Sequence, residues 1–280
     1  MKGENGAGLV LLSAVFFSLG GLFFKLVSWD GLAINSARSL LAGLFILAVM
    51  LKQKHALKVN AAVVGAAAAI AVTNTLYAAA NKLTTAGNVI VLEFTMPVFV
   101  ILIMFLVYRK KPSGLEILTC MLVLGGIICF FVDSLSAGNM LGNALALLAG
   151  FLYAIFFILN SREDSEPYTA ILIAYVISFV IGLPSLLKTD VVHTPVSMLA
   201  AVAALGFIQQ GLGHLCFSAG ITKTNAVAAS LISGLEPVLN PILTAVFYHE
   251  MVTPLSLIGA LIVLGSIITY NVVTSAGGKK

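Results

Sequence analysis

Ten apolar stretches, each about 20 residues long, follow one another along the chain and are separated by short polar segments. A helix of about 20 apolar residues spans the hydrocarbon core of a bilayer, which is about 30 Å thick. Each stretch therefore predicts one membrane-spanning helix, and the whole chain an all-α membrane protein. The predicted spans are residues 8–27, 31–51, 59–80, 85–108, 114–132, 139–159, 168–187, 197–219, 225–248 and 254–273.

The composition indicates the same class. Apolar residues make up 60% of the chain and charged residues 9%, with a mean hydropathy of +1.09. Average soluble domains are about 25% charged. Too few charges are present to cover a water-facing surface, which excludes a soluble globular protein. The predicted loops, residues 161–167 among them, are each only a few residues long and leave no room for a soluble domain.

The basic residues predict the orientation of the chain. If the N-terminus is cytoplasmic, eleven Lys and Arg residues fall on the cytoplasmic side and three outside. Because cytoplasmic loops carry the excess of Lys and Arg, both termini are expected in the cytoplasm of a bacterium, with the helices in the inner membrane. The net charge of +4 is then a topology signal and not a sign of nucleic-acid binding. The cytoplasmic set is Lys2, Lys52, Lys54, Lys58, Arg109, Lys110, Lys111, Arg162, Lys223, Lys279 and Lys280, and the outer set is Lys25, Lys82 and Lys188.

The chain also repeats itself with an offset of 140 residues and no gap. This predicts two five-helix repeats, residues 1–136 and 137–280. Because five is an odd number, the second repeat must enter the membrane from the opposite face, so the repeats are expected to be inverted. Inverted repeats are typical of transporters with a site near the membrane midplane. The residues with identical partners 140 positions later are Thr84, Ala86, Pro97, Val98, Tyr108, Leu115, Val123, Leu124, Gly125, Ile127 and Ile128.

The two repeats carry several motifs in the same order, except that Arg38 of the first motif has no counterpart in the second repeat, where Tyr175 stands nearby. The motifs are Ala37-Arg38-Ser39-Leu40-Leu41-Ala42, Pro97 with Tyr108-Arg109-Lys110, Glu236-Pro237 with Tyr248-His249-Glu250, Leu124-Gly125-Gly126 and Leu264-Gly265-Ser266. Over essentially its whole length the chain resembles the ten-helix EamA-type branch of the drug/metabolite transporter superfamily. The resemblance implies a central cavity lined by helices one, three, four, six, eight and nine. It also implies the transport of a small metabolite. The chain departs from the family pattern in the first repeat, where Lys110 stands in place of the Glu that Glu250 supplies in the second.

Three charged residues lie deep inside predicted spans, where a charge is costly and usually faces protein or a wet cavity. At 1.5 Å per residue, Glu93 lies roughly 12 Å, Glu236 roughly 16 Å and Arg38 about 10 Å deep. We interpret Arg38 as a structural residue that ties helices together, with Glu93 as a possible partner. Glu236 shares a helix face with Ser233, Asn240 and Thr244, a polar stripe that favours a water-filled path. Poor solvation there would favour its protonated form, which allows proton coupling.

Two further helices carry polar and aromatic residues at helical spacing. Helix three carries Asn74, Tyr77 and Asn81, and helix eight carries Gln210, His214 and Phe217. Under the offset of 140, Asn74 corresponds to His214 and Tyr77 to Phe217. These residues could bind substrate or join helices by hydrogen bonds. The predicted substrate-binding residues are Glu236, His214, Asn74, Tyr77, Glu93, Tyr153, Asn240, Ser233 and Gln210, and the predicted structural residues are Arg38, Pro97 and Pro237.

These features favour a secondary transporter, most simply an exporter of an amino acid or related zwitterion. Its partners would be the small-molecule substrate and membrane lipid, and the protein would be a monomer or homodimer. Transport of an organic cation, nucleoside or vitamin is the alternative, and a membrane-embedded enzyme or scaffold fits less well. No phosphate-binding loop, metal-ligand spacing or nucleophile–base motif is evident. The sequence therefore predicts no cofactor, no metal and no catalytic residue.

Overall fold

The computed structural model describes residues 6–84, 86–132, 135, 139–248 and 253–277, and all regular structure within these ranges is helical. The helices, in chain order, are α1 (Gly6–Ser18), α2 (Gly20–Phe24), α3 (Gly31–Lys52), α4 (Ala61–Leu83), α5 (Ala86–Glu93), α6 (Met96–Leu106), α7 (Gly114–Phe131), α8 (Met140–Asn160), α9 (Pro167–Leu186), α10 (Val196–Ala204), the π-helix η2 (Leu205–Leu212), α11 (Gly213–Ile221), α12 (Ala226–Ser233), α13 (Glu236–Tyr248) and α14 (Pro254–Gly277).

The predicted spans are present as helices. In the described part of the chain, nine helical stretches are long and apolar enough to cross a membrane. The remaining predicted span is α4, a helix of 23 residues whose apolar part covers Ala61–Tyr77. The chain is therefore a multi-pass membrane protein of nine to ten apolar helices.

Four spans that the sequence predicts as continuous helices are interrupted. The first divides at Leu19 into α1 and α2, the fourth into α5 and α6, the eighth contains η2, and the ninth divides into α12 and α13. The fourth and ninth breaks, at residues 94–95 and 234–235, lie 140 positions apart. Pro97 and Pro237 each stand in the first turn of the helix that follows a break. A proline has no backbone N–H, and the first turn of a helix needs none, so both predicted structural prolines suit a helix start.

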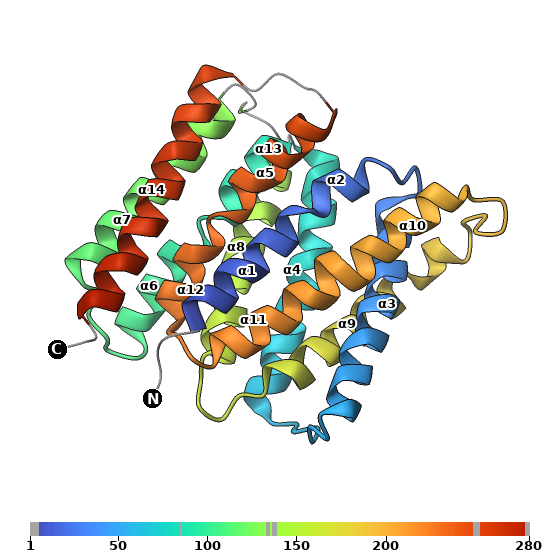
Figure 1. Cartoon of the computed structure of the whole chain (residues 1–280), viewed down its shortest axis with the longest axis horizontal. Coiled ribbons are helices and arrows are strands. Elements are labelled where there is room, and N and C mark those ends of the chain that lie inside the picture. Colours follow the sequence, from blue (N-terminus) through green and yellow to red (C-terminus); the bar gives the residue numbers. More distant parts are fainter. Residues whose placement is uncertain (1–5, 85, 133–134, 136–138, 249–252, 278–280) are drawn as a thin grey trace.

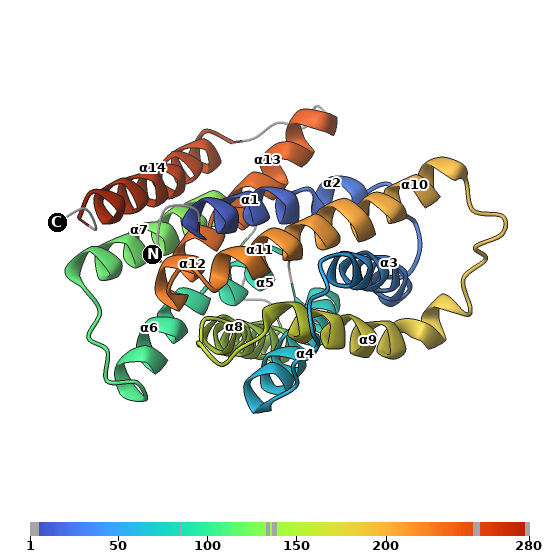
Figure 2. The ribbon, with the colours of Figure 1, turned by 60° about the horizontal axis from the view of Figure 1, so that its bottom comes forward.

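Four antiparallel helix pairs hold the bundle together, namely α3 with α9, α4 with α8, α7 with α14 and α1 with α11. The Ser36 hydroxyl of α3 donates to the carbonyl of Phe179 in α9 at 2.9 Å. The Ser256 hydroxyl of α14 donates to the carbonyl of Phe130 in α7 at 2.8 Å. Each pair therefore joins the first half of the chain to the second. In Figure 2, α4, α8 and α9 lie on one side of the bundle, and α1, α10 and α11 lie on the other.

The first turn of α1 and the last turn of α14 lie at the same end of the bundle (Figure 1), which we call the terminal side. The loop from α3 to α4 and the loop from α8 to α9 are also on this side, while the loop from α2 to α3 is at the opposite end. Three phenylalanines in the interior, Phe156, Phe157 and Phe217, are each at most 1% exposed. The rings of Phe156 and Phe217 stack with their centroids 5.2 Å apart. This aromatic cluster joins α8 to α11.

Close packing at Gly150 of α8 positions the end of α5. A Cβ atom at Gly150 would lie 2.6 Å from the carbonyl oxygen of Glu93 and 3.0 Å from that of Leu92. Overpacking of this kind costs about 1–3 kcal/mol. We expect Gly150→Ala to lower the melting temperature of the purified protein by roughly 2–12 °C. Gly125→Ala is the matched control, because a Cβ there meets nothing within 4 Å. Equal melting temperatures for the two variants would contradict this account of the packing.

Candidate functional site

A cavity of about 750 Å³ lies inside the bundle. It is lined by side chains of α1, α2, α3, α4, α5, α8, η2, α11 and α13. Gly31 and Leu32, at the first turn of α3, belong to its wall, so the cavity extends toward the end opposite the terminal side. The second span, α3, therefore also contributes to the cavity, in addition to the spans that the family resemblance implies.

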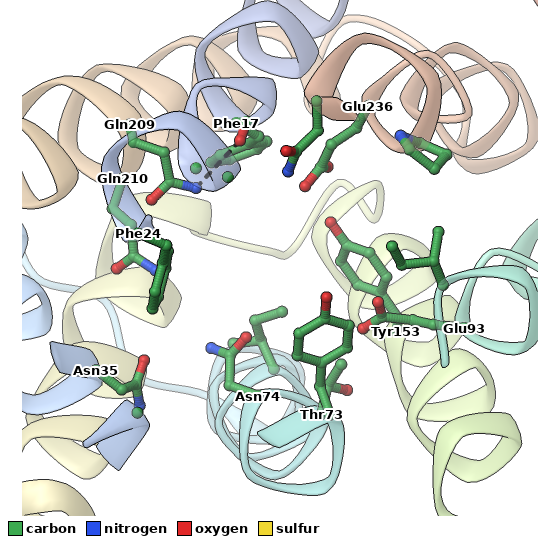
Figure 3. A pocket seen from close by; sticks show the side chains of 18 of the residues that line it. Phe17, Phe24, Asn35, Thr73, Asn74, Glu93, Tyr153, Gln209, Gln210 and Glu236 are labelled. Atoms are coloured by element: carbon green, nitrogen blue, oxygen red, sulfur yellow. Dashed lines mark hydrogen bonds between the residues drawn. The ribbon is translucent and has the colours of Figure 1, made fainter. Parts of the chain in front are cut away.

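Two carboxylate side chains reach the cavity from the two matched helix breaks. Glu93 is the last residue of α5 and Glu236 is the first residue of α13. Figure 3 shows the two side chains on the same side of the cavity, with Tyr153 between them. The two carboxylates are close enough to interact electrostatically. An interrupted helix frees backbone at the membrane midplane only where protein or a water-filled cavity surrounds it, and such breaks are typical of binding sites in transporters.

Arg38 of α3 supplies a positive charge to the same cavity. Its Nε and one terminal nitrogen donate to the side-chain oxygen of Asn35 at 3.2 and 2.9 Å. Its guanidinium lies 4.9 Å from the centre of the Phe24 ring, a cation–π contact. The pairing of Arg38 with Glu93 that the sequence suggested is not found among the described residues, where the side chain of Asn35, one helical turn away, accepts hydrogen bonds from Arg38. Arg38 interacts electrostatically with Glu236 instead.

His214 is held by an aromatic residue that the sequence left without a role. The Tyr175 hydroxyl lies 2.6 Å from Nδ1 of His214 and donates to the backbone carbonyl of Gln210 at 3.1 Å. The His214 ring also packs edge-on against Phe17, with the centroids 4.7 Å apart. These contacts fix the imidazole at the wall of the cavity.

The structure brings most of the predicted site residues together. Eight of the nine predicted substrate-binding residues line this one cavity, and Arg38 and Pro237 line it as well. Whether they bind substrate remains a prediction. The eight are Glu236, His214, Asn74, Tyr77, Glu93, Tyr153, Asn240 and Gln210.

Ser233 is the exception. It is 5% exposed and is absent from the cavity wall. The prediction assumed a continuous helix through Glu236, but the break at residues 234–235 changes the direction in which the preceding turn points. The side chains of Asn81 and Thr244, and the whole of Glu250, lie outside the described residues.

Sequence reasoning also missed several polar and aromatic residues of the wall. Asn35 could have been found, because it precedes Arg38 by three positions on one helix face. Gln209 could not have been found in this way. It is adjacent to Gln210, which was predicted to face the cavity, and adjacent residues of an α-helix point to different faces. The missed residues are Phe24, Asn35, Thr73, Thr75, Phe94 and Gln209.

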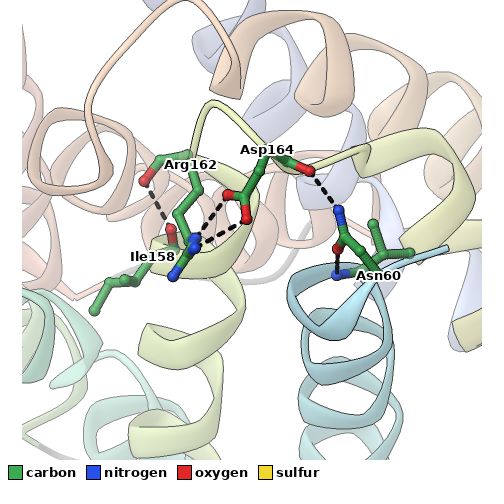
Figure 4. A network of polar contacts seen from close by, with 6 residues as sticks. Asn60, Ile158, Arg162 and Asp164 are labelled. Carbon is green, nitrogen blue, oxygen red and sulfur yellow. Dashed lines mark hydrogen bonds and ion pairs between the residues drawn. The ribbon is translucent and has the colours of Figure 1, made fainter. Parts of the chain in front are cut away.

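On the terminal side of the bundle, the loops that join α3 to α4 and α8 to α9 contact each other. The Asn60 amide donates to the backbone carbonyl of Asp164 at 2.6 Å, and Figure 4 shows this contact beside the Arg162–Asp164 ion pair. Nε2 of His55 lies 2.6 Å from Oε1 of Glu166. Hydrogen bonds from Arg162 lower the pKa of Asp164, so this ion pair persists at neutral pH and is lost only as the pH falls through the lowered value.

A bundle of apolar helices with three intramembrane charges around one internal cavity is the architecture of a multi-pass membrane protein with a polar internal site. The model of the EamA-like transporter family matches residues 4–132 and again residues 140–272. The chain therefore belongs to the EamA-like transporter family, within the drug/metabolite transporter superfamily.

Individual relatives agree with this assignment. An uncharacterized transporter of Clostridium kluyveri is 23% identical over 96% of this chain and 94% of its own length. The uncharacterized transporter YwfM of Bacillus subtilis is 28% identical over the same shares of the two chains. A crystal structure with 14% sequence identity covers 97% of this chain and 99% of its own, with a TM-score of 0.84. That last likeness shows the fold alone.

Proposed function

We propose that this protein is a secondary transporter of an amino acid or a related zwitterion, and that it works as an exporter in a bacterial inner membrane with both termini in the cytoplasm. The observation that carries the proposal is the presence of Arg38 and of the carboxylates Glu93 and Glu236 in the wall of one cavity. Membership of the EamA-like transporter family supports the transport function but leaves the substrate open.

A small molecule that carries both a negative and a positive charge would find an oppositely charged group for each in the wall of this cavity. A guanidinium binds a carboxylate through two parallel hydrogen bonds. A carboxylate within about 4 Å of an ammonium gains a favourable charge interaction that is strong where water is scarce. The volume of about 750 Å³ lies in the range of small-molecule sites. A zwitterion could therefore place its carboxylate at Arg38 and its ammonium at Glu236 or Glu93.

Alternating access would follow from two inverted repeats. The two halves that the family model matches, the breaks 140 residues apart and the antiparallel pairing of α3 with α9 and α7 with α14 all support such repeats. In each of these two pairs, a helix of the first half packs against its counterpart 140 residues later. The cavity extends away from the terminal side, and the opposite arrangement would come from rocking one repeat against the other.

An organic cation is the second candidate. Two carboxylates and the rings of Phe24, Tyr77 and Tyr153 face the same cavity. Aromatic faces and carboxylates together are suited to a cation. Arg38 argues against this candidate, because a cation gains nothing from a guanidinium in the same wall.

A thermal-shift screen of the purified protein tests the proposed substrate class. A ligand that binds only the folded protein raises its apparent stability by about 2.7 kcal/mol at one hundred times its dissociation constant. We expect amino acids to raise the melting temperature, while simple quaternary ammonium compounds do not. The reverse result would favour the organic-cation alternative.

We propose that the loop contacts on the terminal side close the cavity there, which gives a further prediction. Oδ1 of Asn60 accepts from the backbone N–H of Val63 at 2.9 Å and caps α4, while its amide nitrogen reaches Asp164. Asn60→Asp keeps the cap and removes the donor. One such hydrogen bond is worth about 0.5–1.5 kcal/mol, so the ratio of open to closed forms should rise by about two- to tenfold. Spin labels at Leu57 and Ser161 would report this as a larger fraction of long distances.

Asn225→Asp is the matched control for this substitution. Oδ1 of Asn225 caps α12 by accepting from the N–H of Ala228 at 2.7 Å, and within the described part of the chain Asn225 makes no hydrogen bond to another loop. We expect this variant to leave the label distances unchanged. An unchanged distance distribution in Asn60→Asp would mean that the contact does not hold the terminal side closed.

A further inference from the structure

Two adjacent glutamines, Gln209 and Gln210, line the cavity from η2. In an α-helix, neighbouring side chains point in clearly different directions. A π-helix bonds residue i to residue i+5 and has more residues per turn, so neighbouring side chains diverge less. Short π-helical segments occur frequently at functional sites. Here the π-helix brings two amide side chains to one wall, where an α-helix would present one.

Two glycines allow η2 to lie directly against α3. A Cβ atom at Gly206 would lie 2.5 Å from Cβ of Leu41, and one at Gly211 would lie 2.8 Å from the ring of Phe45. The same Gly206 position lies close to the backbone carbonyl of Arg38. The segment that carries Gln209 and Gln210 therefore packs directly against α3, the helix that carries Arg38.

The side-chain oxygen of each glutamine is a buried hydrogen-bond acceptor that receives no hydrogen bond from the described residues. Gln209 and Gln210 are 7% and 5% exposed, and among the described residues neither Oε1 atom has a hydrogen-bond donor. The amide nitrogen of Gln209 donates to the backbone carbonyl of Phe17 at 3.4 Å, which leaves its oxygen as the free group (Figure 3). Buried polar groups without a partner are rare and costly in native proteins. Two of them side by side indicate a site where a ligand supplies the donors.

The charge around this wall indicates what kind of donor fits. Arg38 acts electrostatically on Tyr175 and on His214, the residues that pack against the backbone of Gln210. A second cation would be repelled here, whereas a neutral hydroxyl or amide N–H would not. The charged ends of a zwitterion are already accounted for by Arg38 and by the carboxylates, so the glutamines are available to its side chain.

We propose that Gln209 and Gln210 form the side-chain subsite of the cavity and select amino acids whose side chain carries a neutral hydrogen-bond donor, a hydroxyl or a carboxamide. The proposal rests on the proposed transport of amino acids and adds the class of side chain. A site built around hydrogen-bond acceptors rejects an isosteric analogue that lacks the donor, because its acceptors then stay buried and unpaired.

Counterflow into proteoliposomes tests this with pairs of matched shape, L-threonine against L-valine and L-glutamine against L-methionine. The wild-type protein should favour the first member of each pair by about five- to a hundredfold. Gln210→Met keeps the shape of the side chain and removes the acceptor. It should lose most of this preference through slower transport of threonine and glutamine. Its melting temperature should not fall, because no other described hydrogen bond depends on the Gln210 side chain.

Ser218→Ala is the matched control. The Ser218 hydroxyl is also buried without a partner among the described residues, but Ser218 does not line the cavity. We expect this variant to keep the wild-type preferences. Equal transport within both pairs by the wild-type protein, or an unchanged preference in Gln210→Met, would overturn the subsite while leaving amino-acid transport in place. If none of the four amino acids is transported, the proposed function fails as well.

Discussion

A Glu236→Gln variant is expected to express and fold like the wild-type protein and to lose pH-dependent transport. Glutamine keeps the shape of the side chain and removes its charge. Among the described residues Oε2 of Glu236 has no hydrogen-bond partner, so the substitution breaks no hydrogen bond at that oxygen. Loss of one partner of a buried charge pair costs about 2–5 kcal/mol. Flux at low substrate concentration should therefore fall about thirtyfold or more, as measured in proteoliposomes.

The pH dependence follows from the setting of Glu236. A carboxyl group in a poorly solvated cavity resists ionisation and tends to hold a proton. A substrate ammonium within about 4 Å reverses that preference, because the opposite charge stabilises the carboxylate. Movement between the two repeats would expose the group to each side in turn. Without an ionisable group at this position, proton release can no longer be coupled to substrate binding.

Two results would count against this role of Glu236. Unchanged pH-dependent flux in Glu236→Gln would assign the function to another group, and Glu93→Gln would be the next variant to measure. A Glu236→Gln protein that does not fold would make Glu236 a structural partner of Arg38, with which it interacts electrostatically.

Arg38→Met is expected to have the second large effect. Methionine keeps the apolar stem and removes the guanidinium, so a substrate carboxylate in the cavity would lose a bidentate, charge-assisted partner. The expected loss is again about 2–5 kcal/mol, or thirtyfold and more in apparent affinity. Arg38→Lys keeps the charge but not the planar fork, so it should fall between Arg38→Met and the wild-type protein. Isothermal titration with an amino acid measures both variants.

Binding of an amino-acid methyl ester provides the control for Arg38. The ester has no carboxylate, so its affinity should not fall in Arg38→Met. Wild-type affinity for the free amino acid in Arg38→Met would show that Arg38 joins helices and does not bind substrate. That outcome would return Arg38 to the structural role that its sequence position suggested.

The sequence predicted the helices well because the signal for a membrane span is long and redundant. About 20 apolar residues in a row outweigh local exceptions, and each predicted span is found as helix. The interruptions were missed because apolar composition does not distinguish one helix from two half-helices. Pro97 and Gly234 were the available signals, but a proline or a glycine inside a span is tolerated in unbroken transmembrane helices too.

The errors in the site have the same origin. Ser233 was predicted to share a helix face with Glu236 because the two are three positions apart in a regular helix. The helix is interrupted at residues 234–235, so this spacing no longer places them on one face. Gln209 was left out because the prediction assumed regular α-helical spacing. In the structure it belongs to the π-helix η2 and lines the cavity. Arg38 was correctly located inside a span, but its hydrogen-bond partner is a neutral residue of the same helix and not a second charge. Asn35 satisfies Arg38 locally, which no count of charges along the chain could show.

Counterflow in proteoliposomes with three versions of one substrate is the most direct test of the central claim, that the cavity binds both charges of a zwitterion. The three are L-threonine, its methyl ester without the carboxylate, and the corresponding dihydroxy acid without the ammonium. We predict that only L-threonine is accumulated by the wild-type protein, because only it engages Arg38 and the carboxylates together. Accumulation of the ester equal to that of threonine would contradict the account and identify the protein as a transporter of organic cations.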